Sequence, residues 1–300
     1  MIEAVSVIKR FEDTVALHSF SAEIHRGSVY GLIGSNGSGK STFLRLAAGV
    51  YRPDGGMVRV DSEPVFENEK IKKRIFFVSD DFYYFSQATM EEMARFFEGI
   101  YPCFSMEHYR KTAALFPIDP KKKIQTFSKG MQRQVALILG LAAQADYLLL
   151  DETFDGLDPV IRAALRRILA DDVACRNTAV IITSHNLREL EDMCDQVGLL
   201  HKGNILFQKE IDALKLGFCK VQAAFRPLPD LDRLREQLDI LQLETRGSLL
   251  NMVVRGSSEQ VLSALESYGP LFAESLPLTL EEVFINEMEA VGYDYNNVLF

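Results

Sequence analysis

A glycine-rich segment constrains the fold of this 300-residue chain more than any other feature. It consists of Gly34, Ser35, Asn36, Gly37, Ser38, Gly39, Lys40, Ser41 and Thr42. Its glycines let successive backbone amides point at the phosphates of a nucleotide, while Lys40 adds a mobile positive charge and Ser41 offers a hydroxyl to Mg2+. The segment therefore predicts a phosphate-binding loop that holds a nucleoside triphosphate.

The residues on either side of this loop support that prediction. Residues 29–33 form an apolar run typical of a buried strand, and residues 42–48 have the pattern of a helix start. The positive end of a helix dipole at this point favours an anion. A flexible glycine loop that binds nothing is the competing interpretation, and the two flanks argue against it.

Composition excludes several classes of protein. Apolar residues make up 47% of the chain, which is enough to form hydrophobic cores, so a disordered chain is excluded. Charged residues near the amino terminus argue against a secretory signal, and the longest apolar run, residues 135–143, is about half the length of a membrane-spanning helix. The four cysteines are too scattered for a metal or redox pair and are expected to be free thiols in a reducing cytoplasm. A net charge of −9 argues against a general nucleic-acid binder, so we expect no nucleic-acid partner.

Strand-like and helix-like runs alternate through the first 220 residues. Apolar runs at 29–33, 147–150 and 179–183 are each followed by a helical pattern, which predicts an α/β fold with a largely parallel sheet. A helical stretch from about residue 85 to residue 145 interrupts the alternation and contains the capping-box spelling from Thr89 to Glu92. We therefore expect a nucleotide-binding domain over residues 1–220 with an inserted helical subdomain.

The pattern changes after residue 220. Residues 221–300 carry 13 acidic side chains against five arginines and no lysine, whereas the first 220 residues are almost balanced in charge. The runs follow the order strand, helix, strand, strand, helix, strand, at residues 221–225, 231–238, 240–245, 249–254, 259–268 and 271–276. This order predicts a small α+β domain of the ferredoxin-like kind. The domain has no recognisable catalytic group, so a regulatory or dimer-stabilising role and an inert extension of the fold are both open.

Two carboxylates end the apolar run that starts at Tyr147. The end of a parallel strand beside a phosphate loop is where a Mg2+ ligand must lie, so we expect Asp151 on the metal side. Glu152, one residue further on, points differently and is expected to polarise or orient the water that attacks the γ-phosphate. Two acids that merely end a strand are the alternative, which the nearby phosphate loop disfavours.

The segment from Phe127 to Gln132 reads Phe-Ser-Lys-Gly-Met-Gln. Together with the phosphate loop and the two carboxylates, it makes the chain resemble the nucleotide-binding subunit of an ATP-binding-cassette (ABC) transporter over about residues 1–215. That family usually has Leu-Ser-Gly-Gly-Gln at the first five of these positions. Only Ser128 and Gly130 are kept, in a Ser-Lys-Gly-Met form that looks like a variant from exporter-like branches. The resemblance implies that Ser128 and the Gly130 amide contact the γ-phosphate of a nucleotide held by the opposite subunit; without it, the segment would be only a capped helix start.

Three further positions resemble the family pattern. Phe11 matches the aromatic residue that stacks on adenine, and residues 155–158 match the loop that crosses the dimer interface and brings Asp158 to the nucleotide site. Asp158 precedes Pro159 and so also suits a helix N-cap, a role that is compatible with the first. His185 matches the histidine that contacts the γ-phosphate and helps to organise the attacking water. A core position for Phe11 and a capping or surface position for His185 are the alternatives.

Two positions depart from the family pattern. The family has a glutamine where this chain has Asp80, directly after the run at residues 76–79. Glutamine reaches Mg2+ through its carbonyl and donates through its amide, whereas an ionised aspartate only accepts. We expect Asp80 to accept from metal-bound water, with altered coupling between nucleotide and partner as the consequence. Thr153 replaces the usual proline after the catalytic glutamate, which is a milder change.

The resemblance implies an enzyme that hydrolyses ATP with Mg2+, in a P-loop NTPase fold of the ABC type with Lys40, Glu152 and His185 as its catalytic residues. Two such chains, identical or closely paralogous, would pair head to tail with one ATP sandwiched at each phosphate loop. A separate integral membrane permease would bind the helical insertion and residues 80–88, which places the chain in the cytoplasm against the inner face of the cell membrane. Export is the expected direction of transport. This expectation rests only on the Ser-Lys-Gly-Met form of residues 127–132, the segment that we call the signature.

Two other functions compete with this expectation. A soluble cassette ATPase of the translation or chromosome type is one, but a single cassette is present and the interval from Lys40 to Ser128 is too short for a coiled-coil arm. A regulatory subunit that hydrolyses ATP poorly is the other, suggested by Asp80 and the altered signature. The intact phosphate loop and catalytic residues argue against it.

Overall fold

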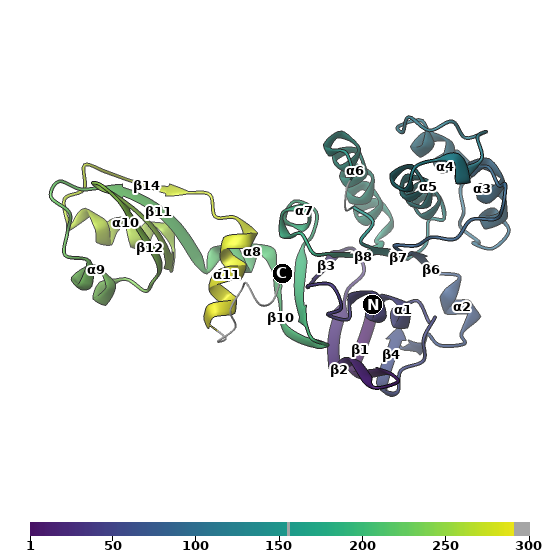
Figure 1. The fold of residues 1–300 in the computed structure, drawn as a ribbon, viewed down its shortest axis with the longest axis horizontal. Coiled ribbons are helices and arrows are strands. Elements are labelled where there is room, and N and C mark those ends of the chain that lie inside the picture. Colours follow the sequence, from purple (N-terminus) through teal and green to yellow (C-terminus); the bar gives the residue numbers. More distant parts are fainter. Residues whose placement is uncertain (155–156, 291–300) are drawn as a thin grey trace. The chain divides into compact units, whose positions relative to one another are not determined.

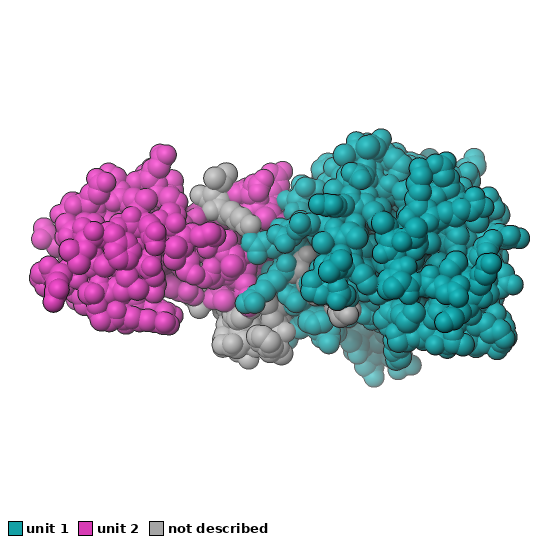
Figure 2. Space-filling model, turned by 90° about the horizontal axis from the view of Figure 1, so that it is seen from above, with its two compact units in different colours: residues 1–208, 299 teal, residues 209–298, 300 magenta. Residues whose placement is uncertain are grey.

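A computed structural model of the chain describes residues 1–154 and 157–290 (Figure 1). They form two compact units, residues 1–208 and the residues from 209 onward, which Figure 2 shows in separate colours. The boundary between the units, after residue 208, lies earlier in the chain than residue 220, at which the change of sequence pattern predicts it. The reason is that α8 (Ile211–Leu216) and β11 (Phe218–Ala224) pack against each other within the second unit.

A six-stranded sheet organises the first unit, in the order β10, β9, β3, β8, β7, β6. The strands from β9 to β6 run parallel, as the alternation of strand-like and helix-like runs predicts. They are β3 (Val29–Ile33), β6 (Ile75–Val78), β7 (Tyr147–Asp151), β8 (Ala179–Ser184) and β9 (Gln196–His201), with β10 (Asn204–Glu210) at the edge. The loops that follow β3, β7 and β8 therefore meet at the carboxyl edge of the sheet, where ligands bind in open α/β folds.

A second, antiparallel sheet of the first unit has the order β2, β1, β4, β5, and the sequence patterns do not foresee it. Its strands are β1 (Ile2–Phe11), β2 (Thr14–Ile24), β4 (Gly55–Val60) and β5 (Glu63–Pro64). The register of β1 shifts against both neighbours, so its side chains do not keep the alternation that marks a strand in a sequence. One hydrophobic cluster joins both sheets to α1 (Lys40–Ala47), and within it the rings of Phe20 and Phe43 lie 4.5 Å apart.

The helical insertion consists of α3 (Met90–Glu98), α4 (Met106–Ala113), η1 (Ile124–Thr126) and α5 (Lys129–Ala142), and its helices lie together in Figure 1. α3 begins with the predicted capping box, in which the side chains of Thr89 and Glu92 each accept a backbone N–H of the other. The other helices of this unit are α2 (Glu69–Lys72), α6 (Pro159–Arg176) and α7 (Leu187–Glu191). Across residues 1–154 and 157–290, no helix has the length and apolar character that would let it cross a membrane.

The second unit is a four-stranded antiparallel sheet in the order β12, β13, β11, β14. Its elements follow the predicted ferredoxin-like order, with α9 (Leu231–Gln237), β12 (Ile240–Arg246), β13 (Leu249–Arg255), α10 (Ser258–Glu266) and β14 (Phe272–Leu276) after β11. Leu234 of α9 and Leu265 of α10 belong to one core cluster with Val221 and Ala223 of β11. α11 (Leu280–Ala290) ends the described part of the chain.

A network of charged side chains ties the two sheets of the first unit together. The Arg74 guanidinium donates to Asp61 and to Asp146, each at 2.6 Å. Arg26 donates to the other oxygen of Asp146 at 2.9 Å, and the Tyr147 hydroxyl donates to Asp61 at 2.6 Å. Because these residues come from the β4–β5 turn, the start of β6, the start of β7 and the β2–β3 loop, the network fixes the edge of the unit opposite the carboxyl ends of the parallel strands.

Candidate functional site

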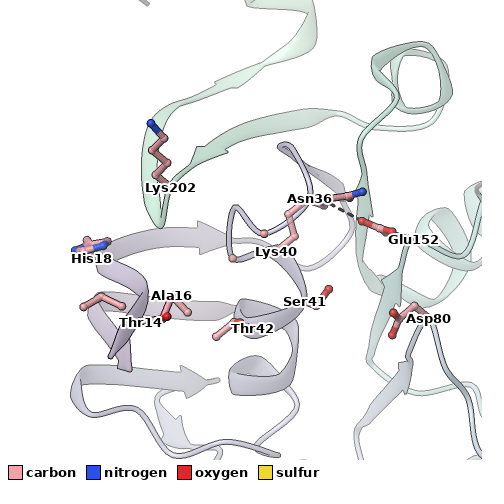
Figure 3. A pocket seen from close by; sticks show the side chains of 13 residues that line it. Thr14, Ala16, His18, Asn36, Lys40, Ser41, Thr42, Asp80, Glu152 and Lys202 are labelled. Atoms are coloured by element: carbon pink, nitrogen blue, oxygen red, sulfur yellow. Dashed lines mark ion pairs between the residues drawn. The ribbon is translucent and has the colours of Figure 1, made fainter. Parts of the chain in front are cut away.

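A cavity of about 570 Å3 lies over the loop that joins β3 to α1, and Figure 3 shows the side chains around it. The predicted phosphate loop forms much of its wall. Gly39 has a φ of +112°, and a Cβ at this position would lie 2.6 Å from the carbonyl oxygen of Ala16, so only glycine fits. The cavity brings together eight of the predicted site residues, namely Asn36, Gly37, Gly39, Lys40, Ser41, Thr42, Asp80 and Glu152.

Lys40 is held inside this site by three oxygen atoms. Its side chain is only 3% exposed, and Nζ donates to the carbonyl oxygens of Gly34 at 2.8 Å and Ser35 at 3.2 Å. Nζ also lies 3.1 Å from Oε1 of Glu152, the ion pair drawn as a dashed line in Figure 3. The buried ammonium is thus satisfied by the loop itself and by the carboxylate that follows β7.

Asp151 lies at the end of β7 with no exposed surface. Its Oδ1 accepts hydrogen bonds from the Ser41 hydroxyl at 3.0 Å and from the Thr183 hydroxyl at 2.7 Å. Burial raises the pKa of Asp151 above its ordinary value, and these two hydrogen bonds oppose the rise. Its Oδ2 is buried and has no hydrogen-bond partner in the part of the chain that the structure describes.

This orphaned oxygen fits the expected Mg2+ site. A buried carboxylate oxygen without a partner is costly unless a cation or water meets it. Mg2+ is usually held by one or two protein oxygens together with phosphates and water. The pair of Ser41 and Asp151 has that donor set, and no group of three or more His, Cys, Asp or Glu side chains gathers as a metal site within the described ranges. The residues present therefore suit a nucleotide-bound Mg2+ rather than a metal held by protein alone.

Glu152 follows β7 in an unusual backbone conformation, with a φ of +49°. Its N–H donates to both the hydroxyl and the carbonyl oxygen of Thr183, at 3.0 and 3.2 Å. Glutamate rarely adopts a backbone conformation with positive φ, and it keeps this conformation only where the surrounding contacts stabilise it. The side chain consequently leaves the strand toward the cavity rather than along the sheet.

Asp80 follows β6 and lines the same cavity. Its carboxylate lies 3.6 Å from a guanidinium nitrogen of Arg45, and its side chain is 47% exposed. The charge of Asp80 contributes to the raised pKa of Asp151 after the dominant effect of burial. The charge of Asp80 therefore reaches Asp151 across the site.

Nine predicted site residues lie outside the cavity lining. Gly34, Ser35 and Ser38 belong to the phosphate loop and Asp151 ends β7 beside it; the other five are Phe11, Ser128, Gly130, Asp158 and His185. Phe11 ends β1, is 39% exposed and packs edge-to-face against Tyr51 with ring centroids 5.3 Å apart. The Ser128 side chain caps α5 by accepting from the Met131 N–H, and Asp158 caps α6 by accepting from the Val160 N–H. Gly130 lies in the first turn of α5, and His185 is exposed just after β8. The neighbouring positions 155 and 156 of the expected interface loop lie outside the described residues.

The cavity also has lining residues that the sequence reasoning missed, namely Thr14, Val15, Ala16, His18 and Lys202. Lys202 occupies the turn between β9 and β10. The next residue, Gly203, donates to the Ser38 carbonyl oxygen at 2.9 Å and accepts from the His18 N–H at 2.8 Å. These contacts fasten the turn to the phosphate loop and to β2. The turn spelling Lys-Gly was visible in the sequence, but nothing there places it beside the loop.

Comparison with known proteins agrees with this geometry. A family model described as "ABC transporter" matches residues 17–155. The ABC transporter ATP-binding protein YtrB of Bacillus subtilis (strain 168) is 32% identical over 285 residues, which cover 95% of this chain and 97% of that protein. The bacitracin transport ATP-binding protein BcrA of Bacillus licheniformis is 28% identical over 219 residues, covering 72% of this chain and 71% of that protein.

Solved structures show the same fold. An ATP-binding subunit of an ABC transporter superposes with a TM-score of 0.66 at 22% identity, over 72% of this chain and 92% of that chain. The dimeric bacterial ABC transporter cassette MJ0796 gives a TM-score of 0.62 at 21% identity, over 70% of this chain and 99% of that chain. The chain belongs to the ABC transporter ATP-binding protein family and is the ATPase subunit of a transporter.

Proposed function

We propose that the chain binds ATP with Mg2+ in the cavity over the phosphate loop and hydrolyses it there. The observation that carries this proposal is the convergence of Lys40, Glu152 and the Ser41–Asp151 pair on one cavity. Lys40 and the loop amides bind the β- and γ-phosphates, and Ser41 and Asp151 hold the metal. Mg2+ supplies neutralisation of the charge on the β- and γ-phosphate oxygens. Glu152 orients and deprotonates the attacking water, with His185 as its assistant.

The site is completed by a second chain of the same kind. Ser128 and Gly130 begin α5, Ser128 is exposed, and neither residue lines the cavity of its own chain within the described residues. A helix start offers free amides and a positive dipole end to an anion. These features support the proposal that they contact the γ-phosphate bound by the opposite chain, with Phe11 against the adenine and Asp158 at the interface.

The membrane partner is an integral permease that docks on the helical insertion. Large aromatic side chains are exposed after β6 and on α3, with Tyr83 at 76%, Phe85 at 45% and Phe96 at 42%. The rings of Phe85 and Phe96 pack edge-to-face with centroids 4.7 Å apart, which joins the two segments into one apolar surface. Exposed apolar patches of this kind mark interaction sites. The docking places the chain in the cytoplasm at the inner face of the cell membrane, and the form of the signature favours export.

Steady-state ATPase assays of the complex with its permease test the catalytic proposal. Glu152→Gln is expected to lower the turnover rate by about 100-fold or more, since a general base contributes that much, while ATP binding persists. The matched control Glu23→Gln removes the same charge from an exposed position of β2, outside the helical insertion and the cavity lining, and should retain the wild-type rate. If the wild type and Glu152→Gln hydrolyse ATP no faster than the background rate measured in EDTA, the chain is instead a weakly hydrolysing regulatory subunit. If no integral membrane protein copurifies with the chain after membrane extraction, the proposal of a permease partner is contradicted.

A further inference from the structure

Thr183 contacts both functional carboxylate residues although it does not line the cavity. It lies on β8 directly opposite Asp151 on β7, and none of its surface is exposed. Its hydroxyl lies 2.7 Å from Asp151 Oδ1 and 3.0 Å from the backbone nitrogen of Glu152. Because the Glu152 N–H can only donate, the hydroxyl must accept from it and give its own proton to the carboxylate. A single buried atom thereby links the metal-side residue to the catalytic glutamate.

The contact with Asp151 leaves one particular carboxylate oxygen for a cation. Oδ1 accepts from the Thr183 hydroxyl and also from the Ser41 hydroxyl at 3.0 Å. Oδ2 is buried, and the hydrogen bonds of the described residues leave it unpaired. Partners behind a ligand carboxylate fix its orientation and tune its affinity for metal. With both donors on Oδ1, the carboxylate is held so that Oδ2 is the oxygen offered to the site.

The contact with Glu152 stabilises a conformation that a glutamate adopts rarely. Its φ of +49° lies in the left-handed region, where a side chain costs energy. The Glu152 N–H is shared between the Thr183 hydroxyl and the Thr183 carbonyl oxygen, the latter at 3.2 Å. This bifurcated bond holds the backbone turn from which the glutamate side chain reaches Lys40.

We propose that Thr183 is a positioning residue of the nucleotide site, whose hydroxyl aims Asp151 Oδ2 at the Mg2+ of a bound nucleotide and holds the backbone of Glu152. The inference rests on the proposed Mg2+-ATP site and concerns residues of this chain alone. Thr183 is buried behind the cavity lining and acts through Asp151 and Glu152. Removal of the hydroxyl should therefore weaken the response to Mg2+ while leaving metal-free nucleotide binding intact.

The test compares the full chain with Thr183→Val, which keeps the side-chain shape, and with Thr183→Ser, which keeps the hydroxyl. Mg2+ is titrated at a fixed concentration of the non-hydrolysable ATP analogue AMP-PNP, and the rise in melting temperature is followed. The affinity for AMP-PNP in EDTA is measured in parallel by calorimetry. Thr183→Val is expected to raise the Mg2+ midpoint by roughly tenfold or more, the size seen for partners behind metal ligands. Thr183→Ser should stay within about threefold of the wild type, with affinities in EDTA unchanged throughout.

An unchanged Mg2+ midpoint in Thr183→Val overturns the proposal, as does an equal loss in Thr183→Ser. If Thr183→Val lacks a cooperative unfolding transition, Thr183→Ala takes its place. Failure of both to fold while Thr183→Ser folds also overturns it, because the hydroxyl would then be needed for folding. A wild type that binds no AMP-PNP with or without Mg2+ refutes the proposed function itself, which is a separate result from a shifted midpoint.

Discussion

The ion pair between Lys40 and Glu152 predicts that the catalytic glutamate opposes the binding of ATP. The Lys40 ammonium must turn toward the phosphates, and in the structure it lies 3.1 Å from Glu152 Oε1. Binding therefore breaks this ion pair and brings the phosphates against a carboxylate. Replacement Glu152→Gln removes both costs and is expected to tighten ATP binding, apart from any effect on hydrolysis.

The size of the effect follows from the geometry. Two unit charges 3.1 Å apart attract by about 5 kcal/mol at an effective dielectric constant of 20. Much of that attraction is offset because Glu152 is 25% exposed and gains hydration when the pair breaks. A net change of about 1 to 2 kcal/mol corresponds to roughly 5- to 30-fold tighter binding.

Calorimetric titration of ATP in EDTA measures this effect without hydrolysis. The control is Glu98→Gln, which changes the net charge equally at an exposed position of α3 and should bind as the wild type does. A tighter complex in Glu152→Gln alone supports competition for Lys40. Equal affinities in the wild type and Glu152→Gln, or weaker binding in the variant, would refute the reasoning.

Three further outcomes are expected. Gly39→Ala should lower the free energy of unfolding in urea by about 2 kcal/mol or more, because the added Cβ meets a carbonyl oxygen at 2.6 Å. The Cβ added by Gly37→Ala meets no atom within 4 Å, so this variant should lose only about 1 kcal/mol. Equal losses in the two variants would contradict this reasoning. Burial favours neutral Asp61, but hydrogen bonds from the amino terminus, Tyr147 and Arg74 outweigh it and lower its pKa. Its contribution to stability is therefore present above about pH 4 and is lost as the pH falls further, so Asp61→Asn should flatten the fall in unfolding free energy below about pH 4. A chain ending at residue 210 should stay monodisperse in size-exclusion chromatography, whereas one ending at 220 keeps the start of β11 without its partners β13 and β14 and should aggregate.

The fold was predictable where strands are buried on both faces. β3, β7 and β8 appear in the sequence as continuous apolar runs because helices or the second sheet cover them. β1 and β2 are half-exposed and carry register shifts, so neither a continuous run nor a clean alternation marks them. The ferredoxin-like unit was predictable because each of its elements is short and regular and is bounded by turn or capping residues.

The site was predictable where its residues are consecutive in the chain. The phosphate loop, Asp151 and Glu152 each belong to a local spelling whose chemistry can be read directly. Thr183 belongs to no such sequence motif, and it reaches Asp151 only because β8 pairs with β7 in one particular register. Lys202 is similar, since its turn meets the phosphate loop through Gly203. Residues that act through a neighbouring strand require the sheet order, which the sequence does not state.

The charges around the cavity indicate why Mg2+ and ATP are expected to bind together. Asp80, Asp151 and Glu152 are three acidic groups, and the charges of Asp80 and Glu152 both raise the pKa of Asp151 after the larger effect of burial. Lys40 lies among them, while Arg45 faces Asp80 from outside the lining at 3.6 Å. A bare triphosphate would meet these carboxylates on the metal side of the cavity, whereas a bound divalent cation offsets both the phosphates and the carboxylates. A glutamine in place of Asp80 would remove one of the acidic groups, so this chain should depend more steeply on Mg2+ than its Asp80→Gln variant does.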